Sequence, residues 1–457
     1  MEKVLVILLP LLLIPCIFQG IECNIGVNYG TVADNLPPPS QVAHFLLEHT
    51  IINRVKIYDT NQQILQAFAH TGIAITVTVP NNLIPNLANL KFSQQWVKTN
   101  IVPHVPATNI IRIVIGNEVL TTTDDTTISY LVPAIQTLHA ALVSEDLDRR
   151  IKVSTPHSLG ILLSSSPPSS GTFKQEHVAL IKQLLGFLRA TNSPFMINPY
   201  PFFGYSHDTL DYAMFRPNSG VFDRMYGKKY TNMLDAQLDA TYSAMRRVGF
   251  GDVQIVIAET GWPSKGDPGQ DGVDIENARE FNGKLIKHVM SGLGTPLMPN
   301  RTFETYVFAL FNENLKPGPT SERNFGLFQP DMTPVYDAGI FRHKVETTSP
   351  SYQDPVRGKP ARSPVQRTDD GKTWCIPKTG AREEVLQANI DYVCGLGLDC
   401  QPIREGGRCF YPKSVHAHAA YAMNVYYQAT GRHDYDCDFR RTGIITSSNP
   451  SYGRCKY

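Results

Sequence analysis

Two glutamates each stand at the end of an apolar run in this sequence. Glu118 closes the run that begins at Ile110, and Glu259 closes the run that begins at Val253. Two carboxyl groups can together cleave a glycosidic bond: a protonated one gives its proton to the leaving oxygen, and an ionised one attacks the sugar or activates water. Glu118 and Glu259 are therefore candidates for this chemistry.

The apolar runs that precede these glutamates are typical of strands buried on both faces of a parallel sheet. In a (β/α)8 barrel, the residues at the carboxyl ends of the strands face the active site. A single glutamate in such a place is more often a rim residue in a surface salt bridge. Two of them, at the ends of the fourth and seventh expected strands, favour catalysis.

Short apolar runs recur along the chain at helix-length intervals. Those interpreted as strands are 25–29, 54–58, 73–79, 110–115, 151–154, 195–198, 253–258 and 306–311. Helical segments fit between them at 62–71, 93–102, 128–144, 175–190, 233–248 and 275–290. This alternation predicts an α/β fold, a (β/α)8 TIM barrel, rather than an open doubly wound sheet. No GxGxxG motif follows the first strand, which argues against nucleotide binding.

Composition limits the partners of the chain. Its 457 residues, 42% hydrophobic and 18% charged, suffice for one large domain and a small one. The balance of 42 Lys and Arg against 41 Asp and Glu gives no attraction to nucleic acid or to an anionic membrane. None of the 13 histidines belongs to a spaced metal cluster. We expect a neutral partner, no metal and no cofactor.

Residues 1–23 have the layout of a cleaved secretory signal, because Lys3 precedes an apolar stretch from Val4 to Phe18. This stretch is shorter than the roughly 20 residues of a transmembrane helix. The last residues, 452–457, are not the hydrophobic tail that a glycolipid anchor requires. We expect a protein secreted to the extracellular space or cell wall, without a membrane anchor.

Cysteines divide the chain. None occurs between residues 24 and 374, and six crowd into the tail: Cys375, Cys394, Cys400, Cys409, Cys437 and Cys455. In an exported protein this density indicates three disulfides that staple a small domain, whereas a zinc site would need paired Cys-x2-Cys spacings that are missing. Residues 345–373 are rich in Pro, Ser, Thr, Arg and Asp and predict a linker. Residues 374–457 then form the small domain.

The strand around Glu259 carries a selective motif. The sequence VIAETGWPSKG at 256–266 resembles the signature of glycoside hydrolase family 17, the plant β-1,3-glucanases. Further similar motifs are IGVNYG at 25–30, VKIYD at 55–59, IGNE at 115–118, INPYPFF at 197–203 and FALFNENLK at 308–316. The resemblance implies a family 17 catalytic domain over residues 24–344.

The resemblance implies roles for the strand-end residues. Glu259 would be the nucleophile, Glu118 the general acid/base, and Asn117 a neighbour of the sugar 2-hydroxyl. The anomeric configuration would be retained, which requires carboxyl groups roughly 5 to 5.5 Å apart. Glu118 must then start protonated, so we expect a raised pKa, to which the charge of Glu259 contributes.

Three charged residues follow the eighth expected strand, where the family has a similar trio: Glu313, Lys316 and Glu322. One of them could rival Glu118 as the acid. We prefer Glu118, because an Asn-Glu pair that ends the fourth strand resembles the wider clan of retaining barrel glycosidases. The trio is then expected to support the site electrostatically or to bind sugar hydroxyls, with a structural salt-bridge network as the alternative.

Aromatic residues lie at or just after strand ends, where they could stack on pyranose rings or orient the nucleophile through their hydroxyls. They are Tyr29, Tyr58, Tyr200 and Phe203. Core packing is the alternative interpretation. It is weaker for Tyr29 and Tyr200 than for Tyr58 and Phe203.

The tail resembles carbohydrate-binding module family 43, also called X8, through WC at 374–375, CFYP at 409–412, YAMNVYYQ at 421–428 and CDF at 437–439. The resemblance implies a small α+β domain that binds β-1,3-glucan. It also implies the pairs Cys375–Cys437, Cys394–Cys400 and Cys409–Cys455, although sequence alone allows 15 connectivities. A helix is expected over 415–430, with most of its tyrosines in the core.

These observations predict a secreted endo-β-1,3-glucanase, a monomer that hydrolyses callose-like or laminarin-like β-1,3-glucan. Two alternatives stay open. One is a glucan-binding wall protein with little turnover, against which the intact pair Glu118 and Glu259 speaks. The other is a transglycosylase that passes the glucosyl ester to another glucan. The sequon at Asn300 is an expected glycosylation site in an exported chain.

Overall fold

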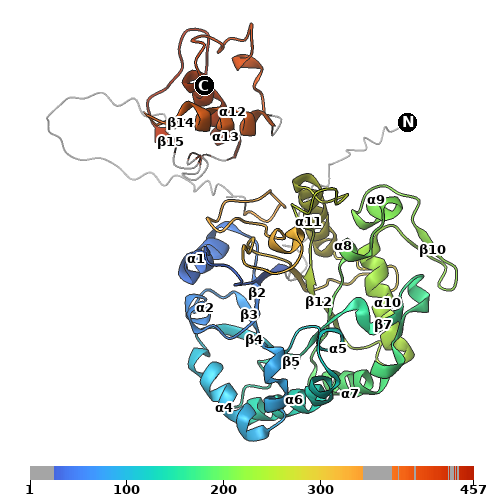
Figure 1. Ribbon diagram of the computed structural model, residues 1–457. Helices are drawn as coiled ribbons and strands as arrows, with labels where there is room; N and C mark the ends of the chain where they lie inside the picture. Colours follow the sequence, from blue (N-terminus) through green and yellow to red (C-terminus); the bar gives the residue numbers. More distant parts are fainter. Residues whose placement is uncertain are drawn as a thin grey trace, which may run out of the picture. The chain divides into compact units, whose positions relative to one another are not determined.

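The structure, a computed structural model, shows a chain that divides into two units, Met1–Thr347 and Thr348–Tyr457 (Figure 1). The predicted signal, residues 1–23, and most of the predicted linker, 345–372, lie outside the described residues. The described residues are 25–342, 373–378, 380–395, 398–430, 432, 437, 439 and 442–457.

A parallel sheet forms the centre of the first unit, in the order β5-β4-β3-β2-β1-β13-β12-β9-β6. Only Thr155 separates β5 from β6, so the two edges of the sheet belong to one interrupted strand and the sheet closes into the predicted eight-stranded barrel. The strands are β1 (Ile25–Tyr29), β2 (Arg54–Ile57), β3 (Ala74–Val79), β4 (Asn109–Ile115), β5 (Lys152–Ser154), β6 (Pro156–Ser158), β9 (Phe195–Asn198), β12 (Ile255–Thr260) and β13 (Thr305–Val307).

Helices surround these strands (Figure 1). The longer ones are α1 (Pro39–His49), α4 (Leu90–Asn100), α6 (Asp125–Ser144), α7 (Gln175–Thr191), α10 (Met233–Arg247) and α11 (Ile275–Met290). The shorter ones are α2 (Gln62–Ala67), α3 (Ile84–Leu87), α5 (Val119–Thr122), α8 (Pro201–Gly204) and α9 (Leu210–Ala213). All the longer helices except α1 were predicted within a few residues at each end.

Local sequence explains where several helices begin. Asn89, Asp124 and Asn232 each accept hydrogen bonds from the backbone amides of the first turn of α4, α6 and α10. Such side chains satisfy amides that have no partner inside the helix. Among the described helices, α6 alone is long and apolar enough to pass for a membrane span, but its inner face belongs to the barrel core.

The barrel interior contains an ion pair far from the carboxyl ends of the strands. Arg112 of β4 donates to both carboxylate oxygens of Glu304, at 2.7 and 3.3 Å, and the Tyr306 hydroxyl donates to the same carboxylate at 2.8 Å. Burial alone would raise the pKa of Glu304, but the charge and hydrogen bonds of Arg112 lower it to about 2. The barrel interior therefore contains charged side chains that are neutralised by pairing with each other.

Two predicted strands end at other residues than expected. The last barrel strand, β13, stops at Val307 rather than at residue 311, because the amide of Phe308 turns to the carbonyl of Thr260 and that of Leu310 to Asn28. By contrast, β12 runs past residue 258 to Thr260, so Glu259 lies within the strand.

Two hairpins, β7–β8 (Leu162–Ser164 and Thr172–Phe173) and β10–β11 (Val221–Asp223 and Lys228–Tyr230), were not predicted. The second belongs to the long connection between β9 and α10. Buried Asp223 anchors it by accepting hydrogen bonds from the amide and hydroxyl of Ser169, both at 2.7 Å. The hairpin is therefore fixed to the segment that follows β6.

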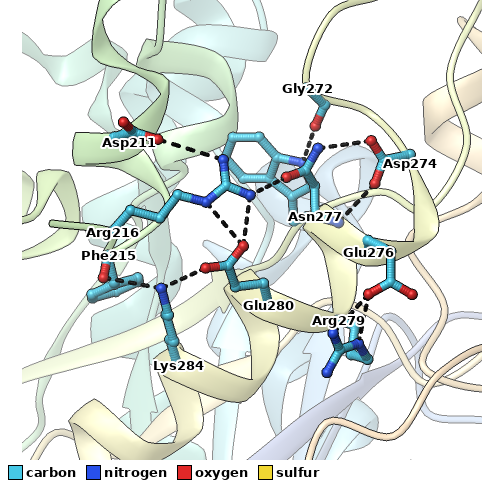
Figure 2. A network of polar contacts seen from close by, with 11 residues as sticks. Asp211, Phe215, Arg216, Gly272, Asp274, Glu276, Asn277, Arg279, Glu280 and Lys284 are labelled. Atoms are coloured by element: carbon cyan, nitrogen blue, oxygen red, sulfur yellow. Dashed lines mark hydrogen bonds and ion pairs between the residues drawn. The ribbon is translucent and has the colours of Figure 1, made fainter. Parts of the chain in front are cut away.

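A polar network ties the β9–α10 connection to α11, as Figure 2 shows. Arg216 donates to Glu280 at 2.9 and 2.6 Å and also contacts Asp211 and Asn277. Lys284 bridges Glu280, at 2.6 Å, to the carbonyl of Phe215. The connection that carries Tyr200 and Phe203 is thus held against a long helix.

The C-terminal unit is a small α+β domain. Strands β14 (Trp374–Pro377) and β15 (Gly443–Thr446) pair antiparallel beside helices α12 (Glu383–Gly395) and α13 (Val415–Thr430). Disulfides join Cys375 to Cys437, Cys394 to Cys400 and Cys409 to Cys455, the pairs that the resemblance implies. Tyr421 and Tyr427 are buried, as expected of the α13 tyrosines. Thr373, assigned to the linker from sequence, bonds to the hydroxyl of Tyr427 and lies in this domain.

Candidate active site

Glu259 lies near the carboxyl end of β12 and is almost completely buried. Lys56 of β2 donates to its Oε1 at 2.7 Å, and the hydroxyl of Tyr58, just after β2, donates to the same oxygen at 2.7 Å. The hydroxyl of Tyr200, which follows β9, donates to Oε2 at 3.2 Å. Three neighbours therefore fix the orientation of this carboxylate.

The two tyrosines remain protonated donors. Burial, and then the charge of Glu259, raises the pKa of the Tyr58 hydroxyl and of the Tyr200 hydroxyl well above 10.0. Neither phenol therefore competes with Glu259 for negative charge. Their O–H groups point at its carboxylate throughout the neutral pH range.

Glu118 is presented by an unusual backbone turn directly after β4. Its φ angle is 53° and that of Gly116 is 67°, both in the left-handed region. The amide of Glu118 donates to the carbonyl of Pro156 at 3.0 Å. The side chain of Asn81 brackets Asn117 by bonding to its amide and its carbonyl, at 2.8 and 3.1 Å. These contacts hold a conformation that a non-glycine residue rarely adopts.

The carboxyl group of Glu118 accepts a hydrogen bond from Asn198 Nδ2 at 2.9 Å. Burial raises the pKa of Glu118, the hydrogen bond from Asn198 opposes this rise, and the charge of Glu259 adds to it. The raised pKa was expected, but burial contributes more than the neighbouring carboxylate. Glu118 thus has the environment of an acid, whereas Glu259 is paired with the Lys56 ammonium.

The trio after the eighth strand separates into two parts. Glu313 is buried, and its Oε1 accepts a hydrogen bond from the amide of Val32 at 2.8 Å. A side chain at Gly30 would meet the Glu313 carboxylate oxygens at 2.4 Å. Lys316 and Glu322 form an ion pair at 3.1 Å. Lys316 and Glu322 are thus paired with each other, while burial, and to a lesser extent the charge of Glu259, raises the pKa of Glu313.

Two aromatic residues differ sharply in exposure. Tyr29 is only 2% exposed and packs edge to face against Phe311, with ring centroids 5.9 Å apart. It therefore packs in the core rather than offering a face to a sugar, which corrects the expectation. Phe203 is 65% exposed and lies beside Tyr200, with centroids 5.2 Å apart. It offers an exposed aromatic face beside Tyr200, the residue whose hydroxyl contacts Glu259.

Sequence reasoning assigned no role to Lys56 or Asn198, although both belong to motifs already quoted. A lysine inside an otherwise apolar strand was the available signal for Lys56, since a buried ammonium needs a partner. His157 of β6 stacks on Phe195 with both ring nitrogens buried. In the described part of the chain, no group of three or more His, Cys, Asp or Glu residues could hold a metal ion.

The arrangement offers one carboxyl group with a raised pKa and one carboxylate oriented by three donors, at the carboxyl ends of barrel strands. A family model described as Glycosyl hydrolases family 17 matches residues 25–340. The chain belongs to this family. The X8 domain model matches residues 373–444.

Similar proteins extend over both units of this family 17 chain. A glucan endo-1,3-beta-glucosidase of Triticum aestivum is 50% identical over 441 residues, which are 95% of this chain and 94% of that protein. A glucan endo-1,3-beta-D-glucosidase of Olea europaea is 44% identical over 438 residues, 95% of this chain and 93% of that protein.

Solved family 17 structures resemble the barrel unit. A β-1,3-glucanase and allergen of Cryptomeria japonica pollen has a TM-score of 0.66 and 44% identity, and the match covers 69% of this chain and 98% of that one. A structure from a study of two plant β-glucan endohydrolases with distinct substrate specificities has a TM-score of 0.62 and 39% identity, covering 68% and 99%. The barrel of this chain is thus a family 17 barrel.

Proposed function

We propose that this protein is an endo-β-1,3-glucanase that hydrolyses internal bonds of β-1,3-glucan with retention of configuration. The observation that carries the proposal is the contrast between two glutamates at the carboxyl ends of barrel strands: Glu118, after β4, has a raised pKa, and Glu259, on β12, is held by three donors. The names of the relatives supply the substrate, because glucan endo-1,3-β-glucosidases of wheat and olive match almost the whole chain.

In the first step, Glu118 gives its proton to the oxygen of the leaving glucan, and the bond from that oxygen to the sugar C1 breaks. A carboxylate oxygen of Glu259 bonds to C1 from the opposite face and forms a glucosyl ester. The partly buried environment of Glu118 favours its protonated start, and the hydroxyls of Tyr58 and Tyr200 hold Glu259 in the orientation for attack.

In the second step, Glu118 takes a proton from water as the water oxygen attacks C1, and the ester bond to Glu259 breaks. Two inversions at C1 give net retention. The exposed face of Phe203 and the side chain of Asn117 are proposed to contact sugar rings and hydroxyls of the substrate.

The C-terminal X8 domain is proposed to bind β-1,3-glucan and to raise the concentration of the barrel near an insoluble polymer. Export fits the three disulfides, which persist in oxidising compartments. We further propose that Asn300 carries a glycan, since it is exposed and its backbone amide donates to the carbonyl of Leu293. The protein is proposed to act as a monomer.

Product analysis tests this proposal. Wild type, Glu259→Gln and Glu118→Gln are incubated with soluble β-1,3-glucan, and reducing ends and the product anomer are followed by proton NMR. Glu276→Gln is the matched control, because this side chain is 75% exposed on α11 and pairs only with neighbouring Arg279 among the described residues.

We expect short oligosaccharides released first as the β-anomer, with activity lost in the two site variants and kept in the control. Release of the α-anomer would contradict retention. Longer glucans instead of shorter ones would indicate transglycosylation. A folded wild type that binds glucan without cleaving it would favour a wall-binding protein.

A further inference from the structure

We propose that Lys56 is a positioning residue for the second step, in which it stabilises the Glu259 carboxylate as that group leaves the sugar. The inference rests on the proposed function, because it requires a glucosyl ester on Glu259. It assigns different tasks to the two carboxylate oxygens of Glu259 and to the two donors that share one of them.

The hydrogen bonds distinguish these oxygens. Oε1 accepts from both the Lys56 ammonium and the Tyr58 hydroxyl, each at 2.7 Å, whereas Oε2 has the longer bond from Tyr200 at 3.2 Å. Two strong donors occupy Oε1, so Oε2, which has only the longer bond from Tyr200, is the oxygen more available to bond to C1. Oε1 then becomes the carbonyl oxygen of the ester and stays in contact with Lys56.

Burial makes the charge of Lys56 consequential. Its side chain is 0% exposed, and within residues 25–342 its only ion pair is with Glu259. The ammonium also lies over the Tyr58 ring, 4.2 Å from its centroid, in a cation–π contact. A buried ammonium without a counter-ion is unfavourable. Formation of the ester neutralises Glu259 and leaves Lys56 in this state.

The second step reverses that loss. Water attacks C1 while Glu118 takes its proton, and the electron pair of the C1–Oε2 bond returns to Glu259. Negative charge grows on the carboxylate in the transition state, beside Lys56. An interaction that is stronger in the transition state than in the ester accelerates that step specifically.

Tyr58 provides the contrast within the same site. Its hydroxyl donates to the same oxygen at the same distance but carries no charge. Removing this hydroxyl weakens the orientation of Glu259 in both steps. Removing the ammonium should slow release of the sugar far more than its attachment.

The experiment uses the full chain and a β-1,3-linked glucose disaccharide with 2,4-dinitrophenolate as the leaving group. This group departs without a proton, so the first step is fast and is followed by its absorbance in stopped flow. Lys56→Met, Lys56→Gln and Lys56→Arg are compared with wild type and with the control Tyr58→Phe. Thermal melting checks folding, and intact-protein mass spectrometry measures the glucosyl-enzyme.

For Lys56→Met and Lys56→Gln we expect a burst of about one dinitrophenolate per active site and a steady rate slower by on the order of 10- to 100-fold, with a lower KM. Lys56→Arg, which keeps the charge, should remain within about tenfold of wild type. Tyr58→Phe should show no increase in the burst.

The inference is overturned if folded neutral variants show no burst and no accumulated glucosyl-enzyme, or if Tyr58→Phe accumulates as much of it. If Lys56→Met does not fold, Lys56→Gln and Lys56→Arg are compared instead. Lys56→Gln must then show a larger burst than Lys56→Arg. A wild type that cleaves neither this glycoside nor β-1,3-glucan would overturn the proposed function itself, and this inference with it.

Discussion

Replacing Arg112 with Met would leave the Glu304 carboxylate inside the barrel without its partner. The two side chains are 7% and 10% exposed, and Arg112 donates to both carboxylate oxygens. Arg54, at 4.0 Å, is the only other ion-pair partner of Glu304 in the described chain. The change therefore removes most of the charge compensation from a buried carboxylate.

The magnitude follows from the pKa of Glu304, which is lowered from 4.5 to about 2 in the folded protein. Each pKa unit corresponds to about 1.4 kcal/mol, so the roughly 2.5-unit difference is worth about 3 kcal/mol. Removing one member of a buried ion pair typically lowers stability by a comparable amount, about 3 to 5 kcal/mol. We expect Arg112→Met to lower the free energy of unfolding by about 3 kcal/mol at neutral pH.

The pH dependence has a definite sign. Because the pKa of Glu304 is lower in the folded state, its stabilising contribution is complete above 4.5 and is lost as the pH falls through about 2. Wild type should therefore lose stability in this acid range. Arg112→Met should lose less stability in this acid range, because the stabilising Arg112–Glu304 interaction is already absent from this variant.

Urea unfolding of the full chain measures this effect. The barrel holds two of the three tryptophans, Trp96 and Trp262, so intrinsic fluorescence follows its transition. Arg279→Met is the control, since it breaks an exposed pair with Glu276 and should cost less than about 0.5 kcal/mol. Equal losses in the two variants, or an unchanged acid slope in Arg112→Met, would refute the reasoning.

Other predictions concern the site and the disulfides. Asn198→Ala removes a hydrogen bond that lowers the pKa of Glu118, so the alkaline limb of kcat/KM on soluble glucan should move to higher pH; an unmoved limb would exclude this role. Gly30→Ala places a methyl group 2.4 Å from the Glu313 carboxylate and should lower kcat/KM at least about tenfold, whereas Gly186→Ala, with its nearest atom at 4.0 Å, should not. A disulfide that closes a longer loop restricts the unfolded chain more. Replacing Cys375 and Cys437, 62 residues apart, with Ser should therefore destabilise the C-terminal unit by about 4 kcal/mol, and replacing Cys394 and Cys400, 6 residues apart, by about 2 kcal/mol. Equal losses of stability in calorimetry would contradict this dependence on loop length.

Hydrophobic periodicity predicted most of the barrel, because strands buried on both faces and amphipathic helices leave strong local patterns. It could not predict the break at Thr155, because no local sequence signal marks it. The break arises because β5 pairs with β4 whereas β6 pairs with β9. The early end of β13 is also tertiary in origin, because amides after Val307 bond to distant carbonyls.

The site was predictable only in part, for a similar reason. Strand-end position indicated Glu118 and Glu259, but strand alternation decides which neighbours reach them. Asn28 contacts the carbonyl of Ala258, which lines the barrel interior, so the next residue, Tyr29, faces the other way and packs on Phe311. On β2 the same alternation turns Lys56 inward. Pairing of Lys56 with Glu259 joins residues 203 positions apart, which no local pattern contains.

Covalent labelling tests the central claim most directly, because it identifies the nucleophile by its bond to the sugar. The full chain is incubated with a 2-fluoro derivative of an activated β-1,3-linked glucose disaccharide, because the ester that this sugar forms with the enzyme is slow to hydrolyse. The labelled protein is then digested, and its peptides are sequenced by mass spectrometry. The account predicts a single labelled peptide with the sugar on Glu259, and protection by soluble β-1,3-glucan. A label on Glu118 or Glu313, or an active enzyme that forms no ester, would contradict it.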